Sequence, residues 1–150
     1  MATFVINEWL PEDSSGANGR TAQSEALTII TVLAESDHQI VVIERSAFEQ
    51  KFWNVCKNND DFVTRDIARI YMKDLRFNLT RCVILKPDQT APIPEALAEA
   101  TKTDDHYLLR AQLTVDGSIL VTTDGDLCQA VRQANLPCLF RDEFIEDFIY

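Results

Sequence analysis

The segment Ser118-Ile-Leu-Val-Thr-Thr-Asp-Gly-Asp-Leu127 contains the change of pattern that decides the fold. Residues 118–122 form an apolar run rich in β-branched side chains, which is typical of a buried strand. Asp124 then precedes, and Asp126 opens, residues 126–134, whose apolar side chains recur at helical spacing. A strand that leads directly into a helix in this way is the repeating unit of a parallel α/β sheet.

The alternation of strand and helix continues in both directions along the chain. Apolar runs predict further strands at residues 3–7, 39–43, 81–85 and 137–140. Helical spacing predicts helices at residues 21–36, 46–57, 61–77, 104–113 and 141–150, and a short helix that starts at Pro94. Residues 8–20 and 86–94 carry turn-forming side chains and predict loops. Near-continuous apolar strands are buried on both faces. We therefore predict a single three-layer α/β/α domain over residues 1–150, with a mainly parallel central sheet of about five strands.

The composition is that of an ordinary globular domain and limits the classes of function. The 150 residues are 46% hydrophobic and 25% charged. The apolar runs are too short to span a bilayer, and no N-terminal signal pattern is visible, so we expect a cytoplasmic protein with no membrane association. The net charge of −10 makes non-specific nucleic-acid binding weak. It does not exclude a nucleic-acid enzyme, because carboxylates that hold divalent metals are themselves acidic.

The four cysteines give no metal or disulfide pattern. Cys56, Cys82, Cys128 and Cys138 lie far apart in the sequence, without a CxxC pair. Cys82 and Cys138 fall in predicted strands, where a buried reduced thiol is the expected state.

Acidic side chains follow the predicted strands at the points where ligands bind in parallel sheets. Asp124 and Asp126 follow one strand, and Asp104 and Asp105 open the helix before that strand. A helix N-terminus favours ionised carboxylates, and these are ligands that suit Mg²⁺ or Mn²⁺. The alternative is that these aspartates only cap their helices.

The residues around these aspartates resemble a known family. Asp105 with Leu108, Leu109 and Ala111, Gly117, and the run Ile119 to Leu127 are similar to the C-terminal half of PIN-domain nucleases. The opening run Phe4 to Leu10 is similar to their first strand. The resemblance implies a metal-dependent endoribonuclease, with three or four acids around Mg²⁺ or Mn²⁺ and RNA as the substrate. It also implies, for a small member, the role of a toxin held silent by an antitoxin protein.

The resemblance carries site roles to particular positions of this chain. It implies catalytic positions at Asn7, Glu44, Asp105, Asp124 and Asp126, and metal ligands at Glu49, Asp105, Asp124 and Asp126. Asp104 is the less favoured of its pair. Glu44 and Glu49 are alternatives for the fourth acid, and Glu49 also fits a capping box with Ser46. Lys51 lies on the same predicted helix, near a position where the fourth acid could also occur.

Asn7 stands where the family has its first-strand aspartate. An amide offers one carbonyl oxygen and no charge, so a weaker metal site is expected. Glu8 could compensate only if the strand end twists, because adjacent strand residues point to opposite faces.

A basic stripe on residues 61–77 is a candidate RNA contact. It comprises Arg65, Arg69, Lys73 and Arg76, at spacings of 4, 4 and 3. The alternative is a solvated helix face paired with Asp66 and Asp74.

Other functions remain open at this point. The main alternative is a degenerate, catalytically weak PIN domain that acts as an RNA-binding or protein-interaction module. A toprim-type Mg²⁺ centre would need glycines near Glu44, and a phosphoaspartate receiver would need a lysine near the last strand; the sequence supplies neither. The acidic face of residues 141–150 could form the contact surface of a homodimer or bind an antitoxin protein. The simpler interpretation is a helix that covers the core and turns its acidic face to solvent.

Overall fold

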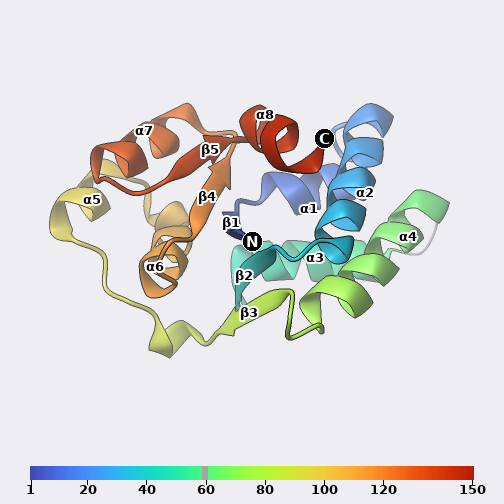
Figure 1. The fold of residues 1–150 in the computed structure, drawn as a ribbon, viewed down its shortest axis with the longest axis horizontal. Helices are drawn as coiled ribbons and strands as arrows, with labels where there is room; N and C mark the ends of the chain where they lie inside the picture. The colour runs from blue at the N-terminus through green and yellow to red at the C-terminus, as the bar shows by residue number, and fades with distance from the viewer. Residues whose placement is uncertain (59–60) are drawn as a thin grey trace.

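The computed structural model describes residues 1–58 and 61–150, and five parallel strands form its centre (Figure 1). The strands are β1 (Thr3–Ile6), β2 (Gln39–Ile43), β3 (Cys82–Leu85), β4 (Ile119–Thr122) and β5 (Cys138–Phe140). Their order across the sheet is β3-β2-β1-β4-β5. The predicted fold class, a single α/β domain with a parallel five-stranded sheet between helices, is confirmed.

The strand order reverses direction at β1. Phe4 of β1 aligns with Ile40 of β2 on one side and with Ile119 of β4 on the other. The chain therefore builds β1, β2 and β3 outward, and then returns to place β4 and β5 beyond β1. Such a reversal opens a crevice at the carboxyl ends of the two strands that flank it. In this fold those strands are β1 and β4.

Helices cover both faces of the sheet because the buried strand side chains alternate between two cores. Phe4, Ile6, Ile40 and Val42 belong to one core. The elements that pack on this side are α1 (Trp9–Ser14), α2 (Arg20–Glu35), α3 (Ala47–Lys57), α4 (Phe62–Ile70), the π-helical η1 (Tyr71–Arg76), α8 (Arg141–Phe144) and the π-helical η4 (Ile145–Ile149). Val5 belongs to the second core.

The second core lies under the helices of the other face. These are α5 (Glu95–Ala100), α6 (His106–Thr114) and α7 (Gly125–Gln133). Two short 3₁₀ turns complete the described chain, η2 (Pro87–Gln89) and η3 (Thr103–Asp105). No described helix has the length and apolar character needed to cross a membrane.

The main departure from the predicted elements is α1, which lies within the predicted loop 8–20. Proline is tolerated in the first turn of a helix, where Pro11 lies. Trp9 and Leu10 are buried in the core, and the Trp9 indole donates a hydrogen bond to the Val121 carbonyl at 3.1 Å. Burial of these two side chains outweighs the turn signals of the neighbouring residues. The predicted helix 61–77 is present, but its last part is π-helical.

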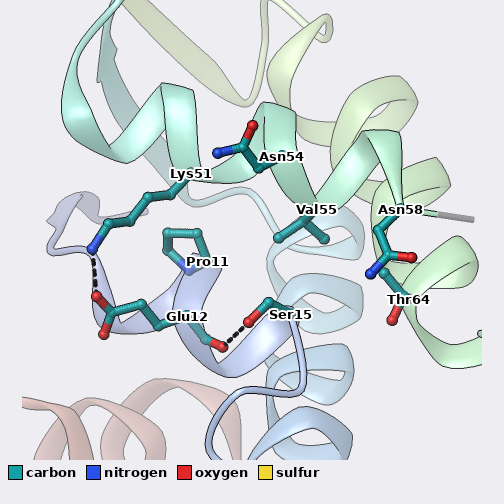
Figure 2. Close-up of a pocket in the computed structure, with 8 residues that line it drawn as sticks. All are labelled: Pro11, Glu12, Ser15, Lys51, Asn54, Val55, Asn58 and Thr64. Carbon is teal, nitrogen blue, oxygen red and sulfur yellow. Dashed lines mark hydrogen bonds and ion pairs between the residues drawn. The ribbon is translucent and has the colours of Figure 1, made fainter.

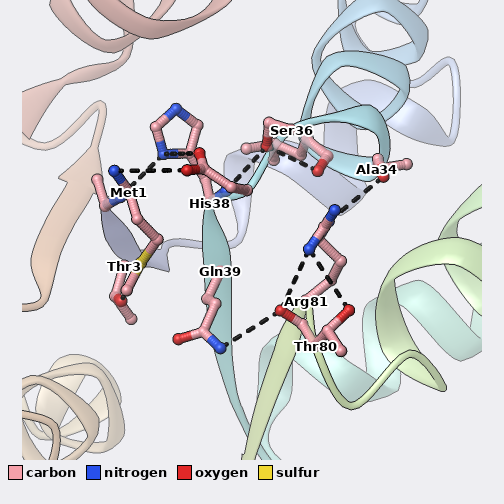
Figure 3. A network of polar contacts seen from close by, with 11 residues as sticks. Met1, Thr3, Ala34, Ser36, His38, Gln39, Thr80 and Arg81 are labelled. Carbon is pink, nitrogen blue, oxygen red and sulfur yellow. Dashed lines mark hydrogen bonds and ion pairs between the residues drawn. The ribbon is translucent and has the colours of Figure 1, made fainter.

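The amino edge of the sheet is closed by a structural network (Figure 3). The Ala2 amide donates to Nδ1 of His38 at 2.9 Å, and the Gln39 side chain donates to the Thr80 carbonyl at 3.4 Å. His38 also packs edge-on against Phe4. These contacts join the starts of β1, β2 and β3, whereas the carboxyl edge carries the predicted site residues.

Candidate metal centre

Three of the predicted acids line one cavity at the carboxyl edge. This cavity of about 280 Å³ is lined by Glu99, Ala100, Thr101, Lys102, Asp105, Asp124, Asp126 and Leu127. Its walls come from α5 with the segment that follows it, from η3, and from the start of α7. Asp105, Asp124 and Asp126 therefore share a cavity beside the crevice that the strand order creates. We name it the acidic cavity.

Asp124 connects the end of β4 to α7 and caps this helix. Its Oδ1 accepts hydrogen bonds from the amides of Asp126 at 3.0 Å and Leu127 at 3.2 Å. Among the described residues, its Oδ2 has no hydrogen-bond partner. The capping role and a ligand role are therefore compatible, because each uses a different oxygen.

Asp105 ends η3 and is partly buried in the cavity wall. Burial raises the pKa of Asp105 above its ordinary value, and the negative charges of Asp124 and Glu8 raise it further. Lys102 offsets part of this rise. These carboxylates are thus close enough to repel one another, and a bound cation would relieve that repulsion.

Both the nitrogen and the oxygen of the Asn7 side-chain amide form hydrogen bonds at the end of the sheet. Its Nδ2 donates to Oγ1 of Thr122 at 3.0 Å, and its Oδ1 accepts from the Glu8 amide at 2.7 Å. Thr122 Oγ1 also accepts from the Asp124 amide at 3.1 Å. Asn7 therefore joins the ends of β1 and β4 without adding charge to the acidic cavity.

Glu8 directly follows β1, at a position where the strand has already ended. Its backbone is helical, with φ −66° and ψ −8°, so the alternation of strand side chains no longer applies. Oε2 of Glu8 accepts from the Tyr107 hydroxyl at 3.0 Å, and Oε1 lies 2.9 Å from Nζ of Lys51. Burial and the charge of Glu8 both raise the pKa of Tyr107.

Lys51 extends from α3 toward α1, where its Nζ also lies 2.5 Å from Oε1 of Glu12 (Figure 2). Partial burial lowers the pKa of Lys51, but the hydrogen bonds and charges of Glu12 and Glu8 outweigh it, and the net pKa lies above the ordinary value. The ammonium is therefore charged at neutral pH. It also borders a second cavity of about 300 Å³ between α1, α3 and α4.

The two alternatives for the fourth acid lie away from the acidic cavity. Glu44 follows β2 and lines a separate cavity with Arg45, Lys86, Pro87 and Asp88. Glu49 is 3% exposed, and its Oε1 lies 2.6 Å from the Arg76 guanidinium. Its Oε2 accepts from the Arg45 amide at 2.7 Å, and its own amide donates to Oγ of Ser46 at 3.3 Å. Both carboxylate oxygens of Glu49 are thus engaged in structural contacts.

The predicted basic stripe is not continuous on the surface. Arg76 is only 8% exposed and pairs with Glu49, so it departs from the stripe and is not available to RNA. Arg65, Arg69 and Lys73 are exposed. In Figure 1, α4 lies at the opposite end of the molecule from α5 and α7, which flank the acidic cavity. The structure therefore does not bring the stripe and the acids together.

The carboxylates of the acidic cavity do not form a preassembled metal site. In the part of the chain that the structure describes, no three His, Cys, Asp or Glu side chains form a preassembled metal-binding group. However, Asp105, Asp124 and Asp126 offer hard oxygen ligands to the same space. Mg²⁺ commonly keeps several waters and takes only one or two protein carboxylates. One or two of these three carboxylates, completed by waters, would therefore be enough to hold such an ion.

Sequence reasoning did not identify Tyr107 and Lys102 as parts of the site, and it gave Lys51 no role. Tyr107 lies two residues after Asp105, so a position near the site could have been expected once η3 was placed. Lys51 could not be assigned from spacing alone, because its partners Glu8 and Glu12 lie directly before and within α1, which the sequence predicted as a loop.

Comparison of the chain with protein families, with curated proteins and with solved structures found no match. The arguments on function below therefore rest on the residues and the geometry of this chain.

Proposed function

We propose that this protein is a metal-dependent endoribonuclease that cleaves RNA phosphodiesters at the acidic cavity, with Mg²⁺ or Mn²⁺ held by Asp105, Asp124 and Asp126. The observation that carries the proposal is the shared cavity of these three carboxylates beside the strand-order reversal. The order and directions of the strands are compatible with PIN-like folds. In this proposal the protein could act as a toxin with an antitoxin partner, alone or as a homodimer.

The chemistry follows from the kinds of group present. A bound divalent ion would activate water and stabilise the charge that develops on the phosphate. Asp124 would hold the ion through Oδ2 while its Oδ1 keeps the start of α7 in place. Lys102 lines the same cavity, and its ammonium would attract the RNA phosphate. Asn7 and Thr122 would fix the position of Asp124 through the Thr122 hydroxyl.

The first test is a Mn²⁺ titration by calorimetry of the unmodified protein and of Asp124→Asn, followed by cleavage of RNA. Asparagine caps a helix about as well as aspartate, so the variant should keep α7 while losing one ligand charge. We expect Mn²⁺ affinity to fall at least tenfold and RNA cleavage to be lost.

A neighbouring pair of aspartates supplies the matched control. Asp105 lines the acidic cavity, whereas Asp104 is exposed on the same 3₁₀ turn and does not line it. Asp105→Asn should weaken Mn²⁺ binding, and Asp104→Asn should leave it within twofold. Equal effects of the two changes, or no Mn²⁺ binding to the unmodified protein, would contradict the proposal.

A second candidate function is a non-catalytic RNA-binding or protein-interaction module. Two observations favour it: the neutral amide of Asn7 at the end of β1, and the engagement of Glu8 by Lys51 and Tyr107. In this case RNA binding should persist in Asp124→Asn, measured by fluorescence anisotropy with a labelled oligonucleotide.

A further inference from the structure

The two edge strands of the sheet, β3 and β5, differ in how their outer backbone groups are satisfied. Side chains of the same chain close the outer side of β5. The Cys138 carbonyl accepts from the Arg132 guanidinium at 2.9 Å, and the Phe140 amide donates to Oε1 of Glu143 at 2.9 Å. Arg132 and Glu143 also form an ion pair at 3.1 Å. A further strand therefore cannot add to β5 without displacing this ion pair.

The inner backbone groups of β3 bind β2, and this fixes which groups of β3 point outward. The Ile40 amide donates to the Arg81 carbonyl at 2.8 Å, and the Glu44 amide donates to the Leu85 carbonyl at 2.9 Å. In a parallel ladder, successive residues of a strand direct their backbone groups to alternate sides. The backbone groups of residues 82, 84 and 86 therefore point away from β2, toward the margin of the sheet (Figure 1).

The open stretch of this edge runs from Ile84 to Lys86. Cys82 is covered, because it is 3% exposed and its amide donates to the Asn78 carbonyl at 3.0 Å. In the part of the chain that the structure describes, the amide and carbonyl of Ile84 and the amide of Lys86 have no partner. The Lys86 carbonyl accepts from the Gln89 amide at 3.0 Å and keeps a second lone pair. Lys86 is extended, with φ −83° and ψ 143°, so strand geometry continues to this residue.

These open groups are complementary to themselves in an antiparallel arrangement. When Ile84 of one copy lies opposite Lys86 of another, each amide can donate to the carbonyl of the other residue. A two-fold axis at Leu85 repeats the same bonds on its other side. Leu85 then faces Leu85 of the second copy at a non-hydrogen-bonded position, where opposing side chains are closest. Pro87 removes no bond from this ladder, because the backbone groups at its position are not directed outward.

The charges at the two ends of β3 favour the same arrangement. Arg81 precedes the strand and Asp88 follows it, and neither forms an ion pair within the described residues. The Arg81 guanidinium donates only to neutral oxygens, at 3.4 Å (Figure 3). With Leu85 at the axis, Asp88 of one copy lies opposite Cys82 of the other, next to Arg81. A parallel pairing would instead place like charges side by side.

Exposed apolar side chains on the turn before β3 add to this surface. Leu79 is 83% exposed and Phe77 is 60% exposed, and β3 itself carries the partly exposed Val83, Ile84 and Leu85. Large apolar side chains that gather at one place on a surface mark an interaction site. The open backbone groups and the apolar side chains therefore lie at the same edge of the molecule.

We infer that the protein forms a two-fold dimer in which the β3 edges of two copies pair antiparallel, about an axis at Leu85, into one continuous sheet. Each copy has one open edge, because β5 is closed, so association ends at the dimer and does not continue into a chain of copies. The inference is independent of the proposed function, since other elements line the acidic cavity. Asp124→Asn should therefore leave dimerisation unchanged.

The test is sedimentation velocity of the whole protein from low to high micromolar concentration. We expect monomer and dimer in equilibrium, with no larger species. Ile84→Pro removes an outward amide and no bond to β2, which an edge strand tolerates, and it should weaken dimerisation at least tenfold. Circular dichroism checks that the variant is folded. A protein that stays monomeric at high micromolar concentration would overturn the inference, and so would a dimer that a folded Ile84→Pro leaves unchanged.

A charge exchange tests the antiparallel arrangement without altering the backbone. Arg81→Glu and Asp88→Arg each bring like charges together across the axis, so each variant alone should dimerise more weakly than the unmodified protein. An equal mixture of the two variants restores opposite charges on both sides of the axis and should form a heterodimer. A mixture that associates no more strongly than either variant alone would contradict the arrangement.

Two exposed apolar residues supply a matched pair of variants that should both fold. Leu79→Asp places a charge beside the β3 edge and should weaken dimerisation at least fivefold. Phe62→Asp places the same charge on α4, where Phe62 is 76% exposed, and should leave dimerisation within twofold. Equal effects of the two changes would show that added charge alone opposes association, and would contradict an interface at β3.

Discussion

Asn7 determines, at the scale of a single residue, how much charge the end of β1 carries next to the Thr122 hydroxyl that contacts Asp124. Asn7→Asp would add a carboxylate at the end of β1, and the Thr122 hydroxyl could donate to it while still accepting from the Asp124 amide. We predict that Mn²⁺ binds at least tenfold more tightly to this variant, as measured by calorimetry.

The control for this prediction is Asn135→Asp, which adds the same charge just beyond the far end of α7. It should leave Mn²⁺ affinity within twofold. Unchanged affinity in Asn7→Asp would favour the role of a non-catalytic binding module, since the cavity would then fail to use a ligand that is supplied to it.

Cys56 gives a residue-scale prediction of pH dependence. Burial raises the pKa of the Cys56 thiol from its ordinary value near 9 to about 11. Only the thiolate reacts, so at pH 8 alkylation of Cys56 by iodoacetamide should be about 100-fold slower than that of a free cysteine. The rate should rise about tenfold per pH unit between pH 7 and pH 9. Mass spectrometry measures the rate of alkylation, and the Cys56→Ser variant shows how much of the alkylation occurs at the buried thiols instead.

At the scale of elements, the pair Glu49–Arg76 joins α3 to η1. Both side chains are buried, so the loss of one partner leaves an uncompensated charge inside the protein. We predict that Arg76→Met lowers the free energy of unfolding by about 3 kcal/mol in urea denaturation. Arg69→Met should cost less than about 0.5 kcal/mol, because Arg69 is exposed and its pair with Asp66 is weak. Equal losses in the two variants would contradict a structural role for the buried pair.

The elements also show which features the sequence could predict. The five strands were predictable because each is a short apolar run, and burial on both faces leaves little choice of side chain. Helix α1 was not predictable, because Pro11 and the turn-forming residues after it indicated a loop, although Trp9 and Leu10 are buried. The π-helical end of the predicted helix 61–77 was also not predictable, because nothing in the apolar spacing marks it.

The same contrast holds for the candidate site. Asp105 and Asp124 each stand next to a helix start, and parallel strands bring such positions to one edge, so their nearness could be expected from pattern. The partners of Glu49 and Lys51 could not be expected from the sequence pattern. Both residues lie on α3, and the rotation of that helix on the sheet decides that Glu49 meets Arg76 while Lys51 meets Glu8.

At the scale of the whole molecule, the charge distribution separates two surfaces. The acidic cavity lies near α5 and α7, whereas the exposed Arg65, Arg69 and Lys73 lie on α4 and η1 at the opposite end (Figure 1). Among the residues that the structure describes, Lys102 is the one basic side chain that lines the acidic cavity, and Arg65, Arg69 and Lys73 do not reach it. If the protein acts on RNA as proposed, a short RNA would contact the cavity through Lys102 and a bound ion rather than through the predicted stripe.

The return of the chain across β1 also determines when the site can exist. Asn7 and Thr122, whose side chains join β1 to β4, are 115 positions apart, and closing so long a loop is among the slower steps of folding. During synthesis, Glu8 and Lys51 leave the ribosome long before Asp124. The acidic cavity therefore cannot form until Asp124 and the start of α7 have left the ribosome. If the protein cuts RNA, a nascent chain is harmless to the message and the ribosome that produce it.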